Sequence, residues 1–177
     1  MTEKEIIQNY PFTQIYLIFK EINSLDGFFI VLGVAFGWCE RKGLDVFVSA
    51  MGTVKPEYQA LLNEHHIAFE SGQHTDAQIL NADEVIKSPG IPLTAPIIQK
   101  LVSQGTPVIS EIEFAARYTS ARMICITGSN GKTTTTSLIY DMLHRAGLDV
   151  GLAGNIGNSL ALQVAHEDHA YYVIELS

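Results

Sequence analysis

Residues 123–134 carry the stretch that decides the fold of the second half of this chain: Met123-Ile124-Cys125-Ile126-Thr127-Gly128-Ser129-Asn130-Gly131-Lys132-Thr133-Thr134. A short apolar run enters it, a glycine turn follows, and a polar segment with Lys and Thr leaves it. This order is typical of a buried strand, a phosphate-binding loop and a helix N-terminus, whose backbone N–H groups and dipole attract anions. We expect Lys132 to reach the β- and γ-phosphates of a nucleotide and the Thr133 hydroxyl to hold Mg²⁺.

The glycine spacing departs from the general form of this motif. In G-x-x-x-x-G-K-[ST] the spacer between the glycines is longer, whereas only two residues separate Gly128 from Gly131 here. The alternative is a tight turn followed by a chance Lys-Thr pair. The strand–turn–helix context favours the phosphate-binding interpretation, because the motif requires that context.

The composition indicates a globular protein. Of the 177 residues, 47% are apolar and 17% are charged, as in a globular protein. The length is enough for one large domain or for one and a half. The net charge of -8 argues against a nucleic-acid surface, which needs a basic patch. Cys39 and Cys125 lack metal-ligand spacing, and both are expected in the core of a protein from a reducing compartment. No metal site is expected from the six histidines.

The apolar run at residues 27–39 does not indicate a membrane segment. Its 13 residues are too few to span a bilayer. Arg41 and Lys42 follow it, where a signal peptide would have small residues. We expect a buried strand that runs into a helix, no membrane contact, and a cytoplasmic protein.

Strands and helices alternate through the first part of the chain. Buried strands are expected at 28–32, 45–48, 67–69, 84–87 and 106–109, and helices at 56–65, 75–80, 95–104 and 111–118. The alternation predicts an α/β fold with a parallel, Rossmann-like sheet in a domain of residues 24–118. Residues 1–23 stay an unassigned N-terminal extension, in which Ile15–Phe19 fits either a strand or a helical turn.

A polar break at residues 118–121 marks the expected start of a second α/β domain, residues 119–177. The strand and loop quoted above open it. A helix over 132–145 and strands at 150–152 and 171–175 follow. These few elements cannot bury a complete α/β core, so we expect the beginning of a nucleotide-binding domain that is truncated at Ser177.

Three motifs occur in order in this second part: Thr127–Thr134, then Gly154-Asn155-Ile156-Gly157, then Glu175-Leu176-Ser177. Together they resemble the Mur ligase family. Ser88-Pro89-Gly90-Ile91 and Ile109-Ser110-Glu111-Ile112-Glu113 look like the members that add D-glutamate. The resemblance covers roughly residues 43–177.

The resemblance implies a three-domain, ATP-dependent, cytoplasmic enzyme of peptidoglycan synthesis that acts as a monomer. Its first domain would hold the UDP end of UDP-N-acetylmuramoyl-L-alanine, and its central domain would bind ATP and Mg²⁺. A substrate carboxylate would attack the γ-phosphate, and the amine of D-glutamate would then displace phosphate from the acyl phosphate. Positioning and charge neutralisation are what such phosphoryl transfer needs from a protein.

The family's functional residues map onto individual positions of this chain. By resemblance, Lys132 and Glu175 are catalytic, Thr133 and Glu175 hold Mg²⁺, and Asn155 contacts the substrate near the metal. ATP would bind Gly128, Ser129, Asn130, Gly131, Lys132, Thr133 and Thr134, and the uridine pocket would be shaped by Ser88, Pro89 and Gly90. The alternatives are a solvated acid at a strand end for Glu175, a turn residue for Asn155, and an ordinary tight turn for residues 88–90.

Three departures from the family pattern limit these assignments. The glycine-rich turn that holds UDP is replaced by the apolar residues 32–39, and Ser49-Ala50-Met51 lacks the acid often found after the second strand. The family's carbamylated lysine and its amino-acid-binding domain are not in this sequence. We therefore expect the chain alone to lack ligase activity. An L-alanine-adding ligase and a non-catalytic remnant that at most binds nucleotide remain open alternatives.

Overall fold

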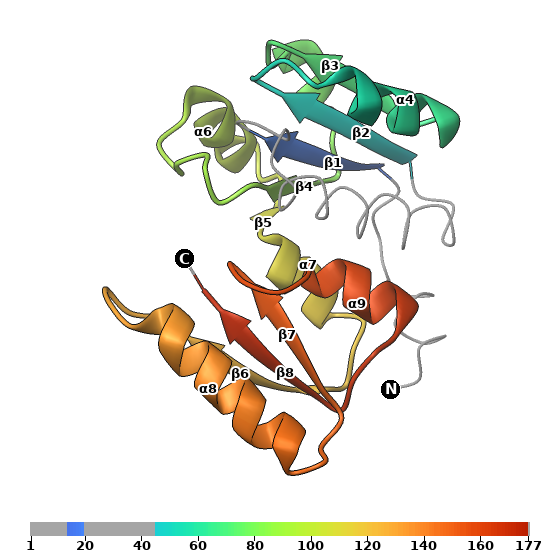
Figure 1. The fold of residues 1–177 in the computed structure, drawn as a ribbon. Helices are drawn as coiled ribbons and strands as arrows, with labels where there is room; N and C mark the ends of the chain where they lie inside the picture. The colour runs from blue at the N-terminus through green and yellow to red at the C-terminus, as the bar shows by residue number, and fades with distance from the viewer. Residues whose placement is uncertain (1–13, 20–44, 177) are drawn as a thin grey trace.

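The computed structural model describes residues 14–19 and 45–176, which form two parallel sheets (Figure 1). The first sheet has the strand order β3-β2-β1-β4-β5. Its strands are β1 (Gln14–Phe19), β2 (Asp45–Ala50), β3 (Ala68–Ser71), β4 (Glu84–Lys87) and β5 (Val108–Ile109). The connecting helices are α4 (Pro56–Glu64), α5 (Asp76–Ile79) and α6 (Pro96–Ser103). The predicted parallel α/β fold is confirmed.

The central strand of the first sheet is β1. It pairs in parallel with β2 on one side and with β4 on the other. Ile15, Leu17 and Ile18 are fully buried, as expected for a strand covered on both faces. The segment that the sequence left open between strand and helical turn is therefore a strand, inside the sheet rather than in an extension. The strand predicted at 28–32 lies outside the described residues.

The second sheet has the order β6-β8-β7, formed by β6 (Arg122–Ile126), β7 (Val150–Gly154) and β8 (Tyr171–Glu175). Helix α8 (Lys132–Arg145) contacts all three strands. The strand at 171–175 and the helix at 132–145 match their predicted bounds. Cys125 is exposed on the edge strand β6, where no described element covers it, so its predicted place in the core is wrong.

Two short helices join the sheets. Helices α7 (Glu111–Ala116) and α9 (Leu160–His166) pack against each other between them (Figure 1). One apolar cluster continues from Leu17 and Val48 through Phe114 and Leu160 to Tyr172. The two sheets therefore share a core. No described helix is long and apolar enough to cross a membrane.

Candidate nucleotide-binding site

The register of the second sheet brings three predicted motifs to one edge. Glu175 is the last residue of β8, and its neighbours across the sheet are Ile126 of β6 and Gly154 of β7. The glycine loop begins directly after Ile126, and Asn155 follows Gly154. The carboxyl ends of parallel strands are where open α/β sheets bind ligands. Segments far apart in sequence thus meet at one ligand-binding edge.

The glycine loop leads directly into α8. Gly131 is the N-cap of this helix with φ +74°, a left-handed conformation that favours glycine. Lys132 is the first helical residue, and its Nζ donates a hydrogen bond to the Gly128 carbonyl at 2.9 Å. The side chain therefore lies back over the loop. Ser129, Asn130, Thr133 and Thr134 are exposed. An exposed loop at a helix N-terminus, with a lysine across it, has the chemistry of an anion site.

Glu175 supplies the carboxylate at this edge. Its side chain is 5% exposed, and its Oε2 atom is buried with no hydrogen-bond partner among the described residues. A buried carboxylate oxygen without a partner is costly. Mg²⁺ prefers oxygen ligands and typically takes one or two carboxylates together with substrate phosphates. The Glu175 carboxylate and the Thr133 hydroxyl are thus suitable donors for this ion.

Asn155 begins the loop after β7. Its backbone N–H donates to the Glu175 carbonyl at 3.0 Å, and its side chain is exposed. The chain then turns back, because the Asn158 N–H donates to the Leu152 carbonyl at 3.2 Å. This turn places Asn155 next to the strand end that carries Glu175.

A cavity of about 310 Å³ lies at the carboxyl edge of the first sheet. Gly90 lines it together with Met51, His74, Ile91 and Pro92. Ser88 and Pro89 are not among its lining residues. The Ser88 hydroxyl instead accepts a hydrogen bond from the Gly90 N–H at 3.3 Å, which shapes the turn.

Lys87 stabilises the turn at residues 88–91 through hydrogen bonds from its side chain. Its Nζ donates to the carbonyls of Ser88 at 3.0 Å and Ile91 at 2.7 Å. Burial of the ammonium group lowers the pKa of Lys87. The lysine therefore acts as a brace for the turn, a role the sequence did not suggest.

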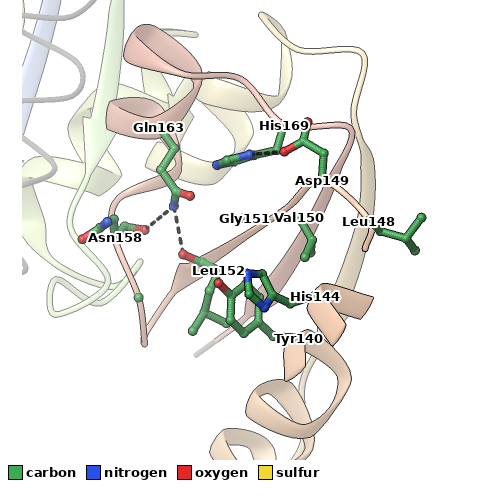
Figure 2. A pocket seen from close by; sticks show the side chains of 11 residues that line it. Tyr140, His144, Leu148, Asp149, Val150, Gly151, Leu152, Asn158, Gln163 and His169 are labelled. Carbon is green, nitrogen blue, oxygen red and sulfur yellow. Dashed lines mark hydrogen bonds and ion pairs between the residues drawn. The ribbon is translucent and has the colours of Figure 1, made fainter. Parts of the chain in front are cut away.

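A second cavity of about 550 Å³ lies between α8, β7 and α9 (Figure 2). His169 Nδ1 is 2.6 Å from an Asp149 carboxylate oxygen, and this bond lowers the pKa of Asp149. Beside His169, the Gln163 amide donates to the carbonyls of Leu152 and Asn158 (Figure 2). None of the site residues predicted from the sequence lines this cavity.

Two domain families match separate parts of the sequence. The MurD N-terminal domain matches residues 39–96, and the Mur ligase middle domain matches residues 126–177. A UDP-N-acetylmuramoylalanine--D-glutamate ligase of Bacteroides thetaiotaomicron is 71% identical over 136 residues, which is 77% of this chain and 31% of that protein. The protein of the same name from Porphyromonas gingivalis W83 is 62% identical over 138 residues, 78% of this chain and 31% of that protein.

The chain belongs to the Mur ligase family. It spans about a third of the length of the curated relatives that it matches. Among solved structures, the UDP-N-acetylmuramate:L-alanyl-gamma-D-glutamyl-meso-diaminopimelate ligase from Neisseria meningitides is similar, with a TM-score of 0.54 at 20% identity. That match covers 93% of this chain and 52% of the other. At this identity the likeness concerns the fold, and it agrees with the parallel-sheet architecture.

Three polar residues beside the first cavity escaped the sequence interpretation. Ser49 is fully buried on β2, Glu70 is its register partner on β3, and His74 follows that strand and lines the cavity. In the sequence, Ser49 directly follows the strand predicted at 45–48 and Glu70 directly follows the strand predicted at 67–69. Polar residues at the ends of two neighbouring parallel strands were the signal that could have found them.

Proposed function

We propose that this chain is the substrate- and nucleotide-binding part of an ATP-dependent ligase that adds D-glutamate to UDP-N-acetylmuramoyl-L-alanine. The observation that carries the proposal is the register at the edge of the second sheet. It sets the buried, unpartnered Glu175 oxygen between the glycine loop and Asn155. The sequence identity to the D-glutamate ligases supports the choice of reaction.

In this proposal the edge of the second sheet binds Mg-ATP. Residues 128–134 bind the phosphates through their backbone N–H groups, and Lys132 moves from the Gly128 carbonyl to the phosphates. Thr133 and Glu175 hold Mg²⁺. The bound Mg-ATP supplies an electrophilic phosphoryl group to the substrate carboxylate. The chain's own part is to neutralise charge there and to position the substrate through Asn155.

The cavity of the first sheet holds the uridine end of the substrate in this proposal. Its volume of about 310 Å³ is at the small end of the range for ligand pockets, which suits one nucleoside. Gly90 and the turn braced by Lys87 form one wall. The proposal also comprises a monomeric, cytoplasmic enzyme of cell-wall synthesis with no nucleic-acid or membrane partner.

Separate binding measurements test this proposal. Calorimetry of the chain with UDP-N-acetylmuramoyl-L-alanine and with a non-hydrolysable Mg-ATP analogue should detect both ligands. Lys132→Ala should weaken the binding of the ATP analogue and leave the binding of UDP-N-acetylmuramoyl-L-alanine unchanged. Tighter binding of UDP-N-acetylmuramate than of the L-alanine-containing substrate would favour an L-alanine-adding ligase instead. Binding of the ATP analogue without either muramoyl substrate would support a nucleotide-binding remnant.

A further inference from the structure

A polar cluster formed by Ser49, Glu70 and His74 lies behind the wall of the first-sheet cavity. The Ser49 hydroxyl donates to Glu70 Oε1 at 2.6 Å and lies 2.6 Å from His74 Nδ1. The Thr75 N–H donates to the same Glu70 oxygen at 2.8 Å. Ser49 is fully buried, and His74 lines the cavity. The cluster therefore connects the interior of the sheet to the cavity wall.

The hydrogen-bond directions in this cluster favour one tautomer of the imidazole. Glu70 Oε1 accepts two hydrogen bonds, from the Ser49 hydroxyl and from the Thr75 N–H. Because the single hydroxyl hydrogen of Ser49 is directed at Glu70, we assign His74 Nδ1 as the donor to Ser49 Oγ. Burial lowers the pKa of His74 more than the nearby Glu70 carboxylate raises it, which favours the neutral ring. In a neutral ring with Nδ1 protonated, Nε2 is an acceptor.

Two polar atoms of the cluster, His74 Nε2 and Glu70 Oε2, have no hydrogen-bond partner among the described residues. His74 lines the cavity and is hydrogen-bonded to Ser49 through Nδ1, and no described residue forms a hydrogen bond with its Nε2 atom. Glu70 Oε2 is buried without a partner among the described residues. Most of the remaining wall is apolar, with Met51, Ile91, Pro92 and Ile97. Its charged residue is Asp76, which is paired with Lys100. An acceptor fixed in a largely apolar wall selects ligands that carry a donor.

We propose that His74, oriented by Ser49 and Glu70, is a specificity-determining residue that accepts a hydrogen bond from a donor group of the uridine bound in this cavity. The inference rests on the proposed uridine site. Uridine has donors of two kinds, the imide N3–H of uracil and the ribose hydroxyls. Either is a neutral donor that suits a neutral imidazole nitrogen.

Calorimetric titrations with UDP analogues test the inference and identify the donor. UDP, 3-methyl-UDP, 2′-deoxy-UDP and 3′-deoxy-UDP are each titrated into the wild-type chain, His74→Phe and the control His65→Gln, a histidine exposed at the end of α4. Loss of one neutral hydrogen bond should weaken UDP about three- to tenfold in His74→Phe. One of the three analogues should bind the wild type about three- to tenfold more weakly than UDP does. The same analogue should bind His74→Phe no more weakly than it binds the wild type. His65→Gln should bind every ligand with the wild-type affinity.

Other results would overturn the inference. Equal UDP affinity of the wild type and His74→Phe rejects the role of His74 and leaves the uridine site intact. Undetectable UDP binding to the wild type rejects both the site and the inference. If His74→Phe does not fold, ¹⁵N NMR of the wild-type imidazole decides. Nδ1 should be protonated, and the Nε2 signal should shift when UDP is added. A proton on Nε2 would contradict the assignment.

Discussion

Gly154 and Glu175 are register partners at the carboxyl ends of β7 and β8, and a Cβ atom on Gly154 would overlap the Glu175 carbonyl oxygen. Gly154 has φ +99°, where side chains are strained. The same carbonyl accepts the Asn155 N–H at 3.0 Å. The backbone that positions Glu175 therefore depends on the absence of a side chain at residue 154.

Gly154→Ala should destabilise the chain more than its backbone conformation alone explains. Gly147→Ala is the matched control, because Gly147 has φ +77° and a Cβ atom added there would meet no atom within 4 Å. The control should cost about 1–2 kcal/mol of unfolding free energy, and Gly154→Ala about 1–3 kcal/mol more through overpacking. Urea denaturation measures both. Equal losses would contradict the proposed close approach at Glu175.

Glu175→Met should separate stability from metal binding. The substitution replaces a buried carboxylate that has an unpartnered oxygen with an apolar side chain of similar length. Unfolding free energy should stay the same or rise by about 1 kcal/mol, while the Mg²⁺ dependence of nucleotide affinity should disappear. Thermal denaturation and calorimetry with and without Mg²⁺ check these outcomes. A less stable variant that keeps its Mg²⁺ dependence would show that Glu175 is structural.

Arg117→Met should expose the cost of an unpaired buried acid. Arg117 Nη1 contacts both Glu84 oxygens, at 2.9 and 3.0 Å, and Glu84 is fully buried. We expect Arg117→Met to lower the unfolding free energy by about 2–4 kcal/mol, as measured by urea denaturation. The loss should be smaller than for a fully buried ion pair, because the arginine side chain is partly exposed. The double variant Arg117→Met/Glu84→Met should recover much of this loss. No recovery would mean that packing, not charge, explains the effect.

Glu111 should make stability depend on pH. Its Oε1 accepts hydrogen bonds from Ser159 Oγ at 2.7 Å and from the Ala161 N–H at 2.6 Å, which tie α7 to α9. Burial raises the pKa of Glu111 despite these bonds. A raised pKa in the folded state adds stability that is complete below the unfolded pKa and lost as pH rises through the folded pKa.

The unfolding free energy of the wild type relative to Glu111→Gln should therefore fall as pH rises above the pKa that a glutamate has in the unfolded chain. Urea denaturation at a series of pH values above this pKa measures the difference. Glu113→Gln, at an exposed acid of the same helix, is the control. The same pH-dependent difference in both variants would contradict the role of burial at Glu111.

Local patterns predicted most of the regular elements. The strands at 84–87 and 171–175 and the helix at 132–145 have the predicted bounds. Short apolar segments, Val85-Ile86 and residues 171–174, indicate the two strands, and Gly131 and Gly147 flank the helix. The meeting of Glu175 with the glycine loop followed from the family resemblance and from the rule that parallel strands end at one edge.

Other features depend on tertiary contacts that the sequence does not display. The sequence predicted a strand at 28–32 and left Ile15–Phe19 open between a strand and a helical turn. Only the pairing with β2 and β4 places Gln14–Phe19 at the centre of the first sheet. Cys125 lies in an apolar run, but its strand is at the edge of the described sheet. Helix α9 was missed although Ser159 caps it, accepting the Leu162 N–H at 3.2 Å.

The most direct test of the proposed nucleotide site is calorimetry of a non-hydrolysable ATP analogue with the wild-type chain and Lys132→Ala, with and without Mg²⁺. Circular dichroism confirms that both proteins are folded. We predict Mg²⁺-dependent binding to the wild type and at least about tenfold weaker binding to Lys132→Ala, because a charge-assisted contact to the phosphates is lost. Equal affinities of the two folded proteins would contradict the assignment of residues 128–134 as the nucleotide site.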